Sequence, residues 1–356
     1  MKPEIIKTLI KRFLSSVVTL FLLVSFLFII IRLSPGDPTD KYISAKLGNE
    51  LSESIAENFS LNQPVIDQYF SFISNALNGD MGVSYNYRLP VFQVIWEYFS
   101  FTLVFATISF VLQIILSVAL ALWIIKKQNR RLESFISDTS LLVYSIPAFV
   151  LGVALIYFFS VNLNLFPVSG LKSLDYDNLS FFSSVLDKVN HLILPMITLT
   201  AAGIALFYKY IKEGMDDVLH QTYILNLKAS GLKEKEIIKK HVMPNALSPL
   251  ISVAGIELGV LVDGALITEV IFSLPGMGRL TVDSILSRDY PLIIGCVLTA
   301  GVVMILTNFV ADIVKIKFDK KLEWILKKKK VAYHNFLPKE YQLLGEPISK
   351  ENKDQD

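Results

Sequence analysis

The chain has 356 residues, of which 53% are hydrophobic and only 19% are charged. This composition excludes an ordinary soluble globular domain and a disordered chain, because neither could keep so much apolar surface out of water. The formal net charge of +2 excludes a global basic field that would recruit nucleic acid. A single cysteine, Cys296, excludes a disulfide framework and every metal site that needs several thiolates.

Six apolar runs are long enough to cross a bilayer, which requires roughly 20 mainly apolar residues in a helix. They cover residues 13–31, 101–125, 139–161, 191–208, 246–268 and 292–311. The first run exceeds the length of a signal-peptide core and lacks a small-x-small cleavage pattern after it, so we interpret it as a retained anchor. The sequence therefore predicts an all-α integral membrane protein with six transmembrane helices and contacts with lipid.

The distribution of basic residues predicts the orientation of these helices. Of the 34 lysines and arginines, 26 fall in the two termini and in the loops on their side of the membrane. Because cytoplasmic loops retain basic residues, both termini are predicted to be cytoplasmic, as in a multi-pass protein of a bacterial inner or plasma membrane.

The chain divides into four parts. Residues 1–32 hold the cytoplasmic N-terminus and the first span, and residues 33–99 form a long extracytoplasmic loop. Helical spacing of apolar residues predicts two short helices in that loop, over 52–59 and 65–77. Residues 100–325 form a five-helix core with a cytoplasmic segment at 209–245, and residues 326–356 are a polar tail that we expect to be disordered.

The cytoplasmic segment 209–245 is longer than a connection between two helices requires, which favours a functional role. Residues 223–230 are typical of a short helix, and Gly231 can adopt the positive φ found where helices end. A second helix is predicted to begin at Lys233 and to end at Pro244. Its apolar face can pack while its lysines meet water, so residue patterns alone leave two interpretations: a connector on the lipid headgroups, or a docking element for another protein.

Three acidic residues lie on or at the end of the fifth span: Glu257, Asp263 and Glu269. Charged groups in a bilayer are costly, so they are candidates for a translocation path. Glu257 and Asp263 are six residues apart, or ~120° around the helix, and cannot both face one narrow cavity wall. Glu269 either contacts the substrate or ties the span to Arg279 or to the returning loop.

The interval of thirteen positions between Gly231 and Pro244, within LNLKASGLKEKEIIKKHVMPNALSPL, resembles the EAA loop of ABC-importer permeases. The version in oligopeptide, dipeptide and nickel permeases is most similar. Further strings follow the order of the same family: LSPGDP at 33–38, GDMG at 79–82, SIPAF at 145–149, FPVSG at 166–170, PGMGR at 275–279 and DYP at 289–291. The resemblance covers roughly residues 5–325.

The resemblance implies a type I ABC importer permease fold and a loop that docks into an ATPase subunit. The implied coupling residues are Tyr223, Leu227, Ala229, Gly231, Leu232, His241, Pro244 and Asn245. The family's acidic and alanine positions are occupied here by residues 225–227, Leu-Asn-Leu, which is a departure. It further implies a homologous second permease, two ATPase subunits and an extracytoplasmic solute-binding protein as partners, with peptide as the favoured cargo and nickel or another small solute as alternatives.

The sequence has no G-x-x-x-x-G-K-[ST] loop that could cradle phosphates, so the chain is expected to be a transport subunit and not an enzyme. We expect it to bind no cofactor or metal itself, with ATP and Mg²⁺ used by the partner ATPase subunits. An ion-coupled secondary transporter remains the alternative, since acids in a span can relay protons, although no inverted repeat is visible. An intramembrane hydrolase is disfavoured, because all three acids lie on one span.

Overall fold

The computed structural model describes residues 3–33, 64–127 and 129–318 of the chain. Within these ranges the protein is helical, and the only β pairing is a bridge between Val83 and Pro90. The elements are α1 (Pro3–Leu33), α3 (Val65–Leu77), α4 (Val91–Lys127), α5 (Arg130–Ser145), α6 (Ala148–Leu155), η1 (Ile156–Asn162), η2 (Tyr176–Asn178), α7 (Phe181–Leu219), α8 (Thr222–Ala229), α9 (Glu234–Ile237), η3 (Ile238–Val242), α10 (Met243–Ile271), α11 (Met277–Ser287) and α12 (Tyr290–Phe318). The predicted helix at 52–59 and the predicted disordered tail lie outside the described residues.

Four straight helices are long and apolar enough to cross a membrane. They are Ile6–Ile31 within α1, then α4, α7 and, within α12, Tyr290–Val310. A fifth candidate is the pair formed by α5 with α6 and η1, which is bent by 100° at its break. The predicted fifth span, 246–268, lies within α10. The multi-pass, all-helical character is thus confirmed for the described residues.

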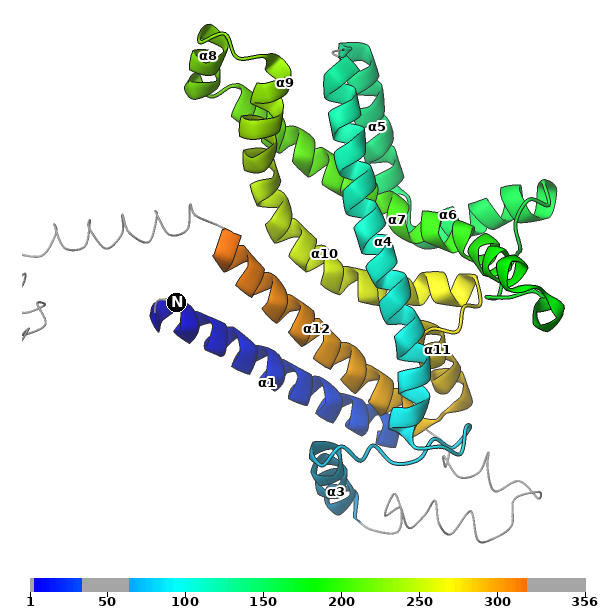
Figure 1. Ribbon diagram of the computed structural model, residues 1–356. Coiled ribbons are helices and arrows are strands. Elements are labelled where there is room, and N and C mark those ends of the chain that lie inside the picture. The colour runs from blue at the N-terminus through cyan, green and yellow to red at the C-terminus, as the bar shows by residue number, and fades with distance from the viewer. Residues whose placement is uncertain (1–2, 34–63, 128, 319–356) are drawn as a thin grey trace, which may run out of the picture.

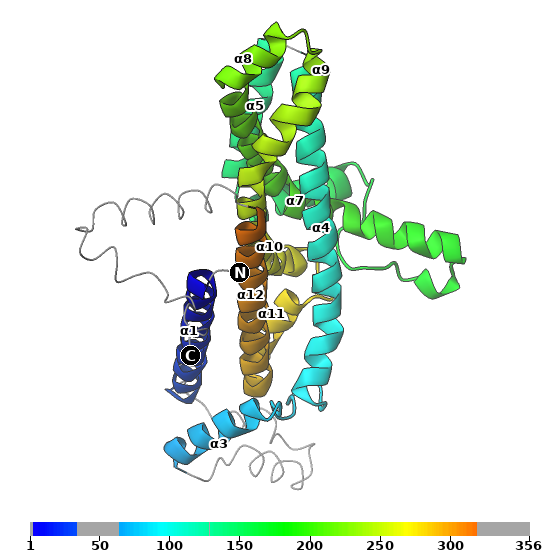
Figure 2. The same ribbon diagram turned by 60° about the vertical axis from the view of Figure 1, so that its left-hand side comes forward.

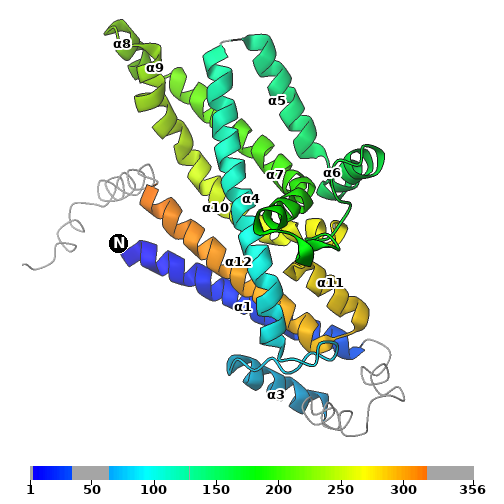
Figure 3. The ribbon, with the colours of Figure 1, turned by 45° about the vertical axis from the view of Figure 1, so that its right-hand side comes forward.

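The predicted third span, 139–161, is not one straight helix (Figure 3). Its break falls at Ile146 and Pro147, both of which have extended backbone, with ψ of 122° and 135°. A proline disfavours helical geometry in the residue before it, and its fixed φ suits the start of the next helix. The Ser-Ile-Pro string therefore redirects the chain instead of crossing straight through.

Helix α7 extends beyond both ends of the predicted span 191–208 and includes the first residues of the segment 209–245. Its apolar face continues there, because Ile211, Met215 and Val218 recur at helical spacing and are all buried. α7 packs against α4, α5 and α10 and so lies at the centre of the molecule.

Pro244 does not end the second helix of the cytoplasmic segment, which corrects the prediction. Helical backbone continues from α9 through the π-helical turn η3 into α10, and Pro244 lies in the first turn of α10. A proline inside a regular α-helix clashes with the carbonyl four residues earlier. The wider π turn changes that spacing, and a first helical turn tolerates proline.

Figure 1 shows α8 and α9 at one end of the molecule and α3 and α11 at the other. Helix α4 runs along most of the distance between the two ends, whereas α7 and α10 run from the end with α8 and α9 towards the middle. Movement of α8 and α9 would pass directly into α7 and α10, the helices that flank them in sequence, and α4 packs in the same buried cluster.

Candidate functional site

The turn between α8 and α9 has the geometry that the sequence predicts. Gly231 has φ +80°, and a side chain built at this position would meet no atom within 4 Å. Its N–H donates to the carbonyl of Lys228, and the N–H of Leu232 donates to the carbonyl of Leu227, at 3.0 and 3.3 Å. These bonds close the end of α8 in the manner of a glycine C-cap. The constraint at Gly231 is therefore its backbone conformation and not the space around it.

The helices on both sides of Gly231 are anchored in a core shared with α7 and α10. Ile224 of α8, Ile237 of α9 and Val242 of η3 are each at most 1% exposed and pack in one cluster with Ile211 and Met215 of α7. Sequence analysis identified the packing face of α9 but missed Ile224. The sequence signal that could have identified Ile224 is its helical spacing with Leu227, which lies three positions later and is partly buried in the same cluster.

Three predicted coupling residues meet where α8 approaches the start of α10. The side-chain amide of Asn245 donates to the carbonyl of His241 at 2.7 Å and to the hydroxyl of Tyr223 at 3.4 Å. Ala229 and Pro244 are exposed and lie apart from this contact. Close by, Gly214 of α7 faces Ala246 of α10, and a Cβ on Gly214 would lie 2.7 Å from the carbonyl oxygen of Ala246. The coupling segment thus forms one packed unit with the ends of α7 and α10.

Glu269 ties α10 to the returning loop at the opposite end of the molecule. It is fully buried, and its Oε2 accepts a hydrogen bond from the N–H of Gly278 at 2.7 Å. Its Oε1 accepts one from the hydroxyl of Thr102 on α4 at 2.6 Å, and that hydroxyl also accepts from the N–H of Met277 at 2.8 Å. A carboxylate at the first amides of a helix is favoured by their unpaired N–H groups and by the helix dipole. Gly276 makes room, since a Cβ there would lie 2.0 Å from the Glu269 carboxyl carbon.

The expected tie between Glu269 and the returning loop is therefore present, made by backbone N–H groups. The side chain of Arg279 turns elsewhere, donating to the carbonyl of Ser273 at 2.7 Å and pairing with Asp283 at 3.5 Å. Sequence analysis did not identify Thr102, whose partner is 167 residues away along the chain. No local pattern could have indicated it.

A second buried carboxylate, Asp289, fastens the outer loop to the start of α12. It is fully buried and accepts hydrogen bonds from the hydroxyl of Ser84 at 2.5 Å and from the N–H of Asn86 at 3.0 Å. Its other oxygen accepts from the N–H of Leu292 at 3.3 Å, which caps α12. The Asp-Tyr-Pro string noted in the sequence thus performs a structural role.

Glu257, another acid of α10, is not part of these ties among the described residues. Glu257 is half-buried and makes no hydrogen bond or ion pair with any described side chain. It is twelve residues from Glu269, or ~18 Å along the helix. The side chain of Asp263 lies outside the described residues, so its role as a path residue stays a prediction.

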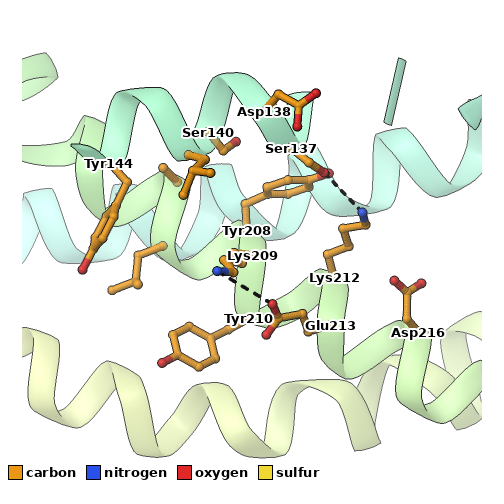
Figure 4. Close-up of a pocket in the computed structure, with 13 residues that line it drawn as sticks. Ser137, Asp138, Ser140, Tyr144, Tyr208, Lys209, Tyr210, Lys212, Glu213 and Asp216 are labelled. Atoms are coloured by element: carbon orange, nitrogen blue, oxygen red, sulfur yellow. Dashed lines mark hydrogen bonds and ion pairs between the residues drawn. The ribbon is translucent and has the colours of Figure 1, made fainter. Parts of the chain in front are cut away.

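A cavity of about 530 Å³ lies between α5 and α7 on the half of the molecule nearer to α8 (Figure 4). It is lined by tyrosines, serines and charges of both signs: Ser137, Asp138, Ser140, Tyr144, Tyr208, Lys209, Tyr210, Lys212, Glu213 and Asp216. The Lys212 ammonium pairs with Glu133 at 3.1 Å and donates to Ser137 at 3.2 Å, which joins α7 to α5. Pockets of this size accept small ligands. None of these residues was singled out from the sequence, because the cavity forms only when two helices meet.

Comparison with known proteins places the chain in a family. Residues 113–324 match the family model described as "Binding-protein-dependent transport system inner membrane component", and residues 5–119 match the model of the N-terminal part of such membrane components. The oligopeptide transport system permease protein AppB of Bacillus subtilis (strain 168) is 33% identical over 317 residues, which cover 89% of this chain and 99% of AppB.

The glutathione transport system permease protein GsiC of Escherichia coli (strain K12) is also 33% identical, over 304 residues that cover 85% of this chain and 94% of GsiC. Among solved structures, a chain of the inward-facing MetNI methionine ABC transporter aligns with a TM-score of 0.48 at 18% identity. That alignment covers 64% of this chain and 94% of the MetNI chain.

Proposed function

Because the chain belongs to the family of inner membrane components of binding-protein-dependent transport systems, we propose that it is the permease subunit of an ATP-driven importer of peptides. Like the permease proteins it resembles, it is a multi-pass membrane transport subunit and not an enzyme. The observation that carries the proposal is the packed unit of α8, Gly231 and α9. From α9 the helical backbone continues through η3 into α10 without a break.

Peptide is the proposed cargo class because of what the relatives are named for. AppB is named for oligopeptide transport and GsiC for transport of glutathione, which is a tripeptide. The cavity between α5 and α7 supports this class, since it presents ammonium and carboxylate groups beside tyrosines. Such a lining suits a solute that carries both charges and apolar side chains.

We further propose six spans with both termini in the cytoplasm. The four straight helices, the bent pair and α10 supply six crossings, and the bias of basic residues supports the orientation. In this topology, α8 and α9 face the cytoplasm, where an ATPase subunit can reach them.

In this proposal, the motion of the ATPase subunits is coupled to the spans because α8 and α9 pack rigidly against α7 and α10. Closure of an ATPase dimer would move α8, and the shared core of Ile224, Ile237 and Met215 would carry that motion into α7 and α10 as one body. A homologous second permease, two ATPase subunits and an extracytoplasmic solute-binding protein complete the proposed complex. ATP and Mg²⁺ act on the ATPase subunits.

At the outer end, Glu269 is proposed to hold α11 in place. Its two oxygens accept hydrogen bonds from Thr102 and Gly278 and the side chain is fully buried, which supports a structural role over contact with a solute. One of Glu257 and Asp263 remains the proposed path residue of α10. The first makes no polar contact with a described side chain.

Gly231→Val tests the coupling proposal, with Gly79→Val as its matched control. Both glycines have φ near +80° and open space around them, so valine imposes similar backbone strain at both positions. We expect Gly231→Val to lower ATP-dependent peptide uptake at least tenfold while the complex still co-purifies, and Gly79→Val to retain most uptake. Wild-type uptake in Gly231→Val, or equal losses in both variants, would contradict the proposal.

A further inference from the structure

Helix α3 lies across the end of α1 that is opposite to the N-terminus (Figure 2). Two ring contacts hold it there, since the ring centroid of Phe28 on α1 lies 5.4 Å from that of Tyr69 and 5.5 Å from that of Phe72. The hydroxyl groups of Tyr69 and Ser25 share a hydrogen bond of 2.6 Å. These contacts fix the position of α3 along the axis of α1.

That position lies near the end of the apolar segment of α1. The apolar segment of α1 ends at Ile31, so Phe28 lies ~4.5 Å and Ser25 ~9 Å inside its end, at 1.5 Å per residue. Helices that lie in the plane of a membrane interface bury their apolar face ~5–10 Å into the boundary between headgroups and acyl chains. The contacts with α1 therefore place α3 at the depth that such helices occupy.

The sequence of α3 divides into one apolar and one polar arc. At 100° per residue, the apolar arc extends ~160° from Phe72 through Tyr69 to Phe70. The remaining arc carries only polar side chains: Asp67, Gln68, Ser71, Ser74 and Asn75.

α1 covers only one edge of the apolar arc. Tyr69 and Phe72 contact α1, whereas Ile66 and Phe70, on the other edge, are each 65% exposed. The surface of α1 beside the contact is also apolar and exposed, with Phe26 62% and Ile29 51% accessible. The uncovered edge of α3 thus adjoins the part of a spanning helix that faces lipid.

We propose that α3 is an interfacial helix whose edge formed by Ile66 and Phe70 inserts among the lipids of the leaflet at the outer end of α1. The exposed residues of its polar arc, Asp67, Ser74 and Asn75, then face the headgroups and water, whereas Gln68 is buried against the protein. The helix thereby fixes the outer end of α1 laterally. The occupant of the uncovered edge is lipid, and neither a partner protein nor another part of the chain.

Site-directed spin labelling of the complete transporter in phosphatidylcholine–phosphatidylglycerol nanodiscs tests this placement. Cys296 is the only cysteine of this chain and is buried, so a Cys296→Ala background combined with cysteine-free partner subunits leaves one labelled site per variant. Labels at Ile66→Cys and Phe70→Cys are compared with matched controls at Asp67→Cys and Ser74→Cys, which lie exposed on the polar arc. Uptake by each labelled variant verifies that the complex is intact.

For spin labels at positions 66 and 70, we expect the collision rate with dissolved oxygen to exceed the collision rate with a water-soluble nickel chelate at least threefold. For labels at positions 67 and 74, we expect the collision rate with the nickel chelate to be the higher of the two. Equal access of the nickel chelate to all four labels would overturn the proposal, because the edge would then face water. Shielding of 66 and 70 from both reagents would also overturn it, since protein would then cover the edge.

A second measurement avoids the cysteine background. Phe70→Trp replaces one aromatic ring with another, and quenching of its fluorescence by lipids brominated near the headgroup is compared with that of Ser74→Trp. We expect at least twofold stronger quenching at position 70 after the native tryptophan signal is subtracted. Equal quenching at the two positions would contradict insertion.

Discussion

At the scale of single residues, two buried carboxylates organise one end of the protein. Glu269 connects α10, α4 and the start of α11, and Asp289 connects the outer loop to the start of α12. Each uses both oxygens to accept hydrogen bonds from groups that would otherwise remain buried without partners. Acidic residues in an apolar chain can thus be structural, and position in a span does not alone assign them to a transport path.

Glu269→Gln is expected to destabilise this end of the protein. The amide that replaces one oxygen cannot accept a hydrogen bond, so either Thr102 or Gly278 loses its acceptor, at a cost of about 2 kcal/mol. Thermal denaturation of the purified complex should show a lowered Tm. Glu97→Gln on exposed α4 surface is the control, and equal Tm values for the two variants would argue against the tie.

Thr102→Val tests the same tie from the other side. Valine has nearly the shape of threonine but can neither donate to Glu269 nor accept from Met277. We expect Thr102→Val to lower the Tm about as much as Glu269→Gln does. We expect the decrease in Tm of the double variant to be smaller than the sum of the two single decreases, because both changes disrupt the same hydrogen-bond network. Full additivity in this double-mutant cycle would show that the two residues act independently.

At the scale of elements, the packed unit of α8, Gly231 and α9 depends on a buried anchor. Ile224 is fully buried, whereas its neighbour Leu225 is 60% exposed. Ile224→Ala should therefore cost about 2–5 kcal/mol of local stability and lower uptake.

Leu225→Ala should leave the stability of the permease unchanged, and any effect on uptake would then reflect docking of the ATPase. Hydrogen exchange over residues 222–242 distinguishes the two variants. Exchange that is accelerated equally in both would contradict the anchor role of Ile224.

Sequence analysis succeeded where a local rule governs the structure. The spacing of apolar residues correctly predicted the helix before Gly231, the start of α9 after Lys233 and the helix 65–77. The chemistry of glycine correctly predicted the positive φ of Gly231. It failed at Pro244 because proline usually ends a helix, and only the π turn before it allows continuation. It also gave no sign of the bend within 139–161, since hydropathy does not reveal direction and the bend is set by Ile146 and Pro147.

Contacts between distant segments were beyond local reasoning. Ser84 and Asp289 are separated by 205 residues and Thr102 and Glu269 by 167, so only the fold brings them together. The cavity between α5 and α7 has the same origin. Long-range pairing leaves no periodic signal in one sequence, which is why these sites appeared only in the structure.

At the scale of the whole molecule, the proposed topology predicts opposite accessibility for two exposed positions. Ser230 lies beside the coupling turn and Ser169 in the loop after η1. In the Cys296→Ala background, Ser230→Cys should react with an impermeant maleimide only from the cytoplasmic side, and Ser169→Cys only from the outside. Labelling of both from the same side would contradict the six-span arrangement.

The central claim is that separate ATPase subunits drive peptide import through this chain. The direct test is uptake of a labelled peptide by proteoliposomes that contain the complete complex, with the solute-binding protein outside and ATP on the side of α8. We predict uptake that requires both hydrolysable ATP and the binding protein and that is insensitive to collapse of ion gradients. Uptake driven by a proton or sodium gradient without ATP would contradict the account and favour an ion-coupled transporter.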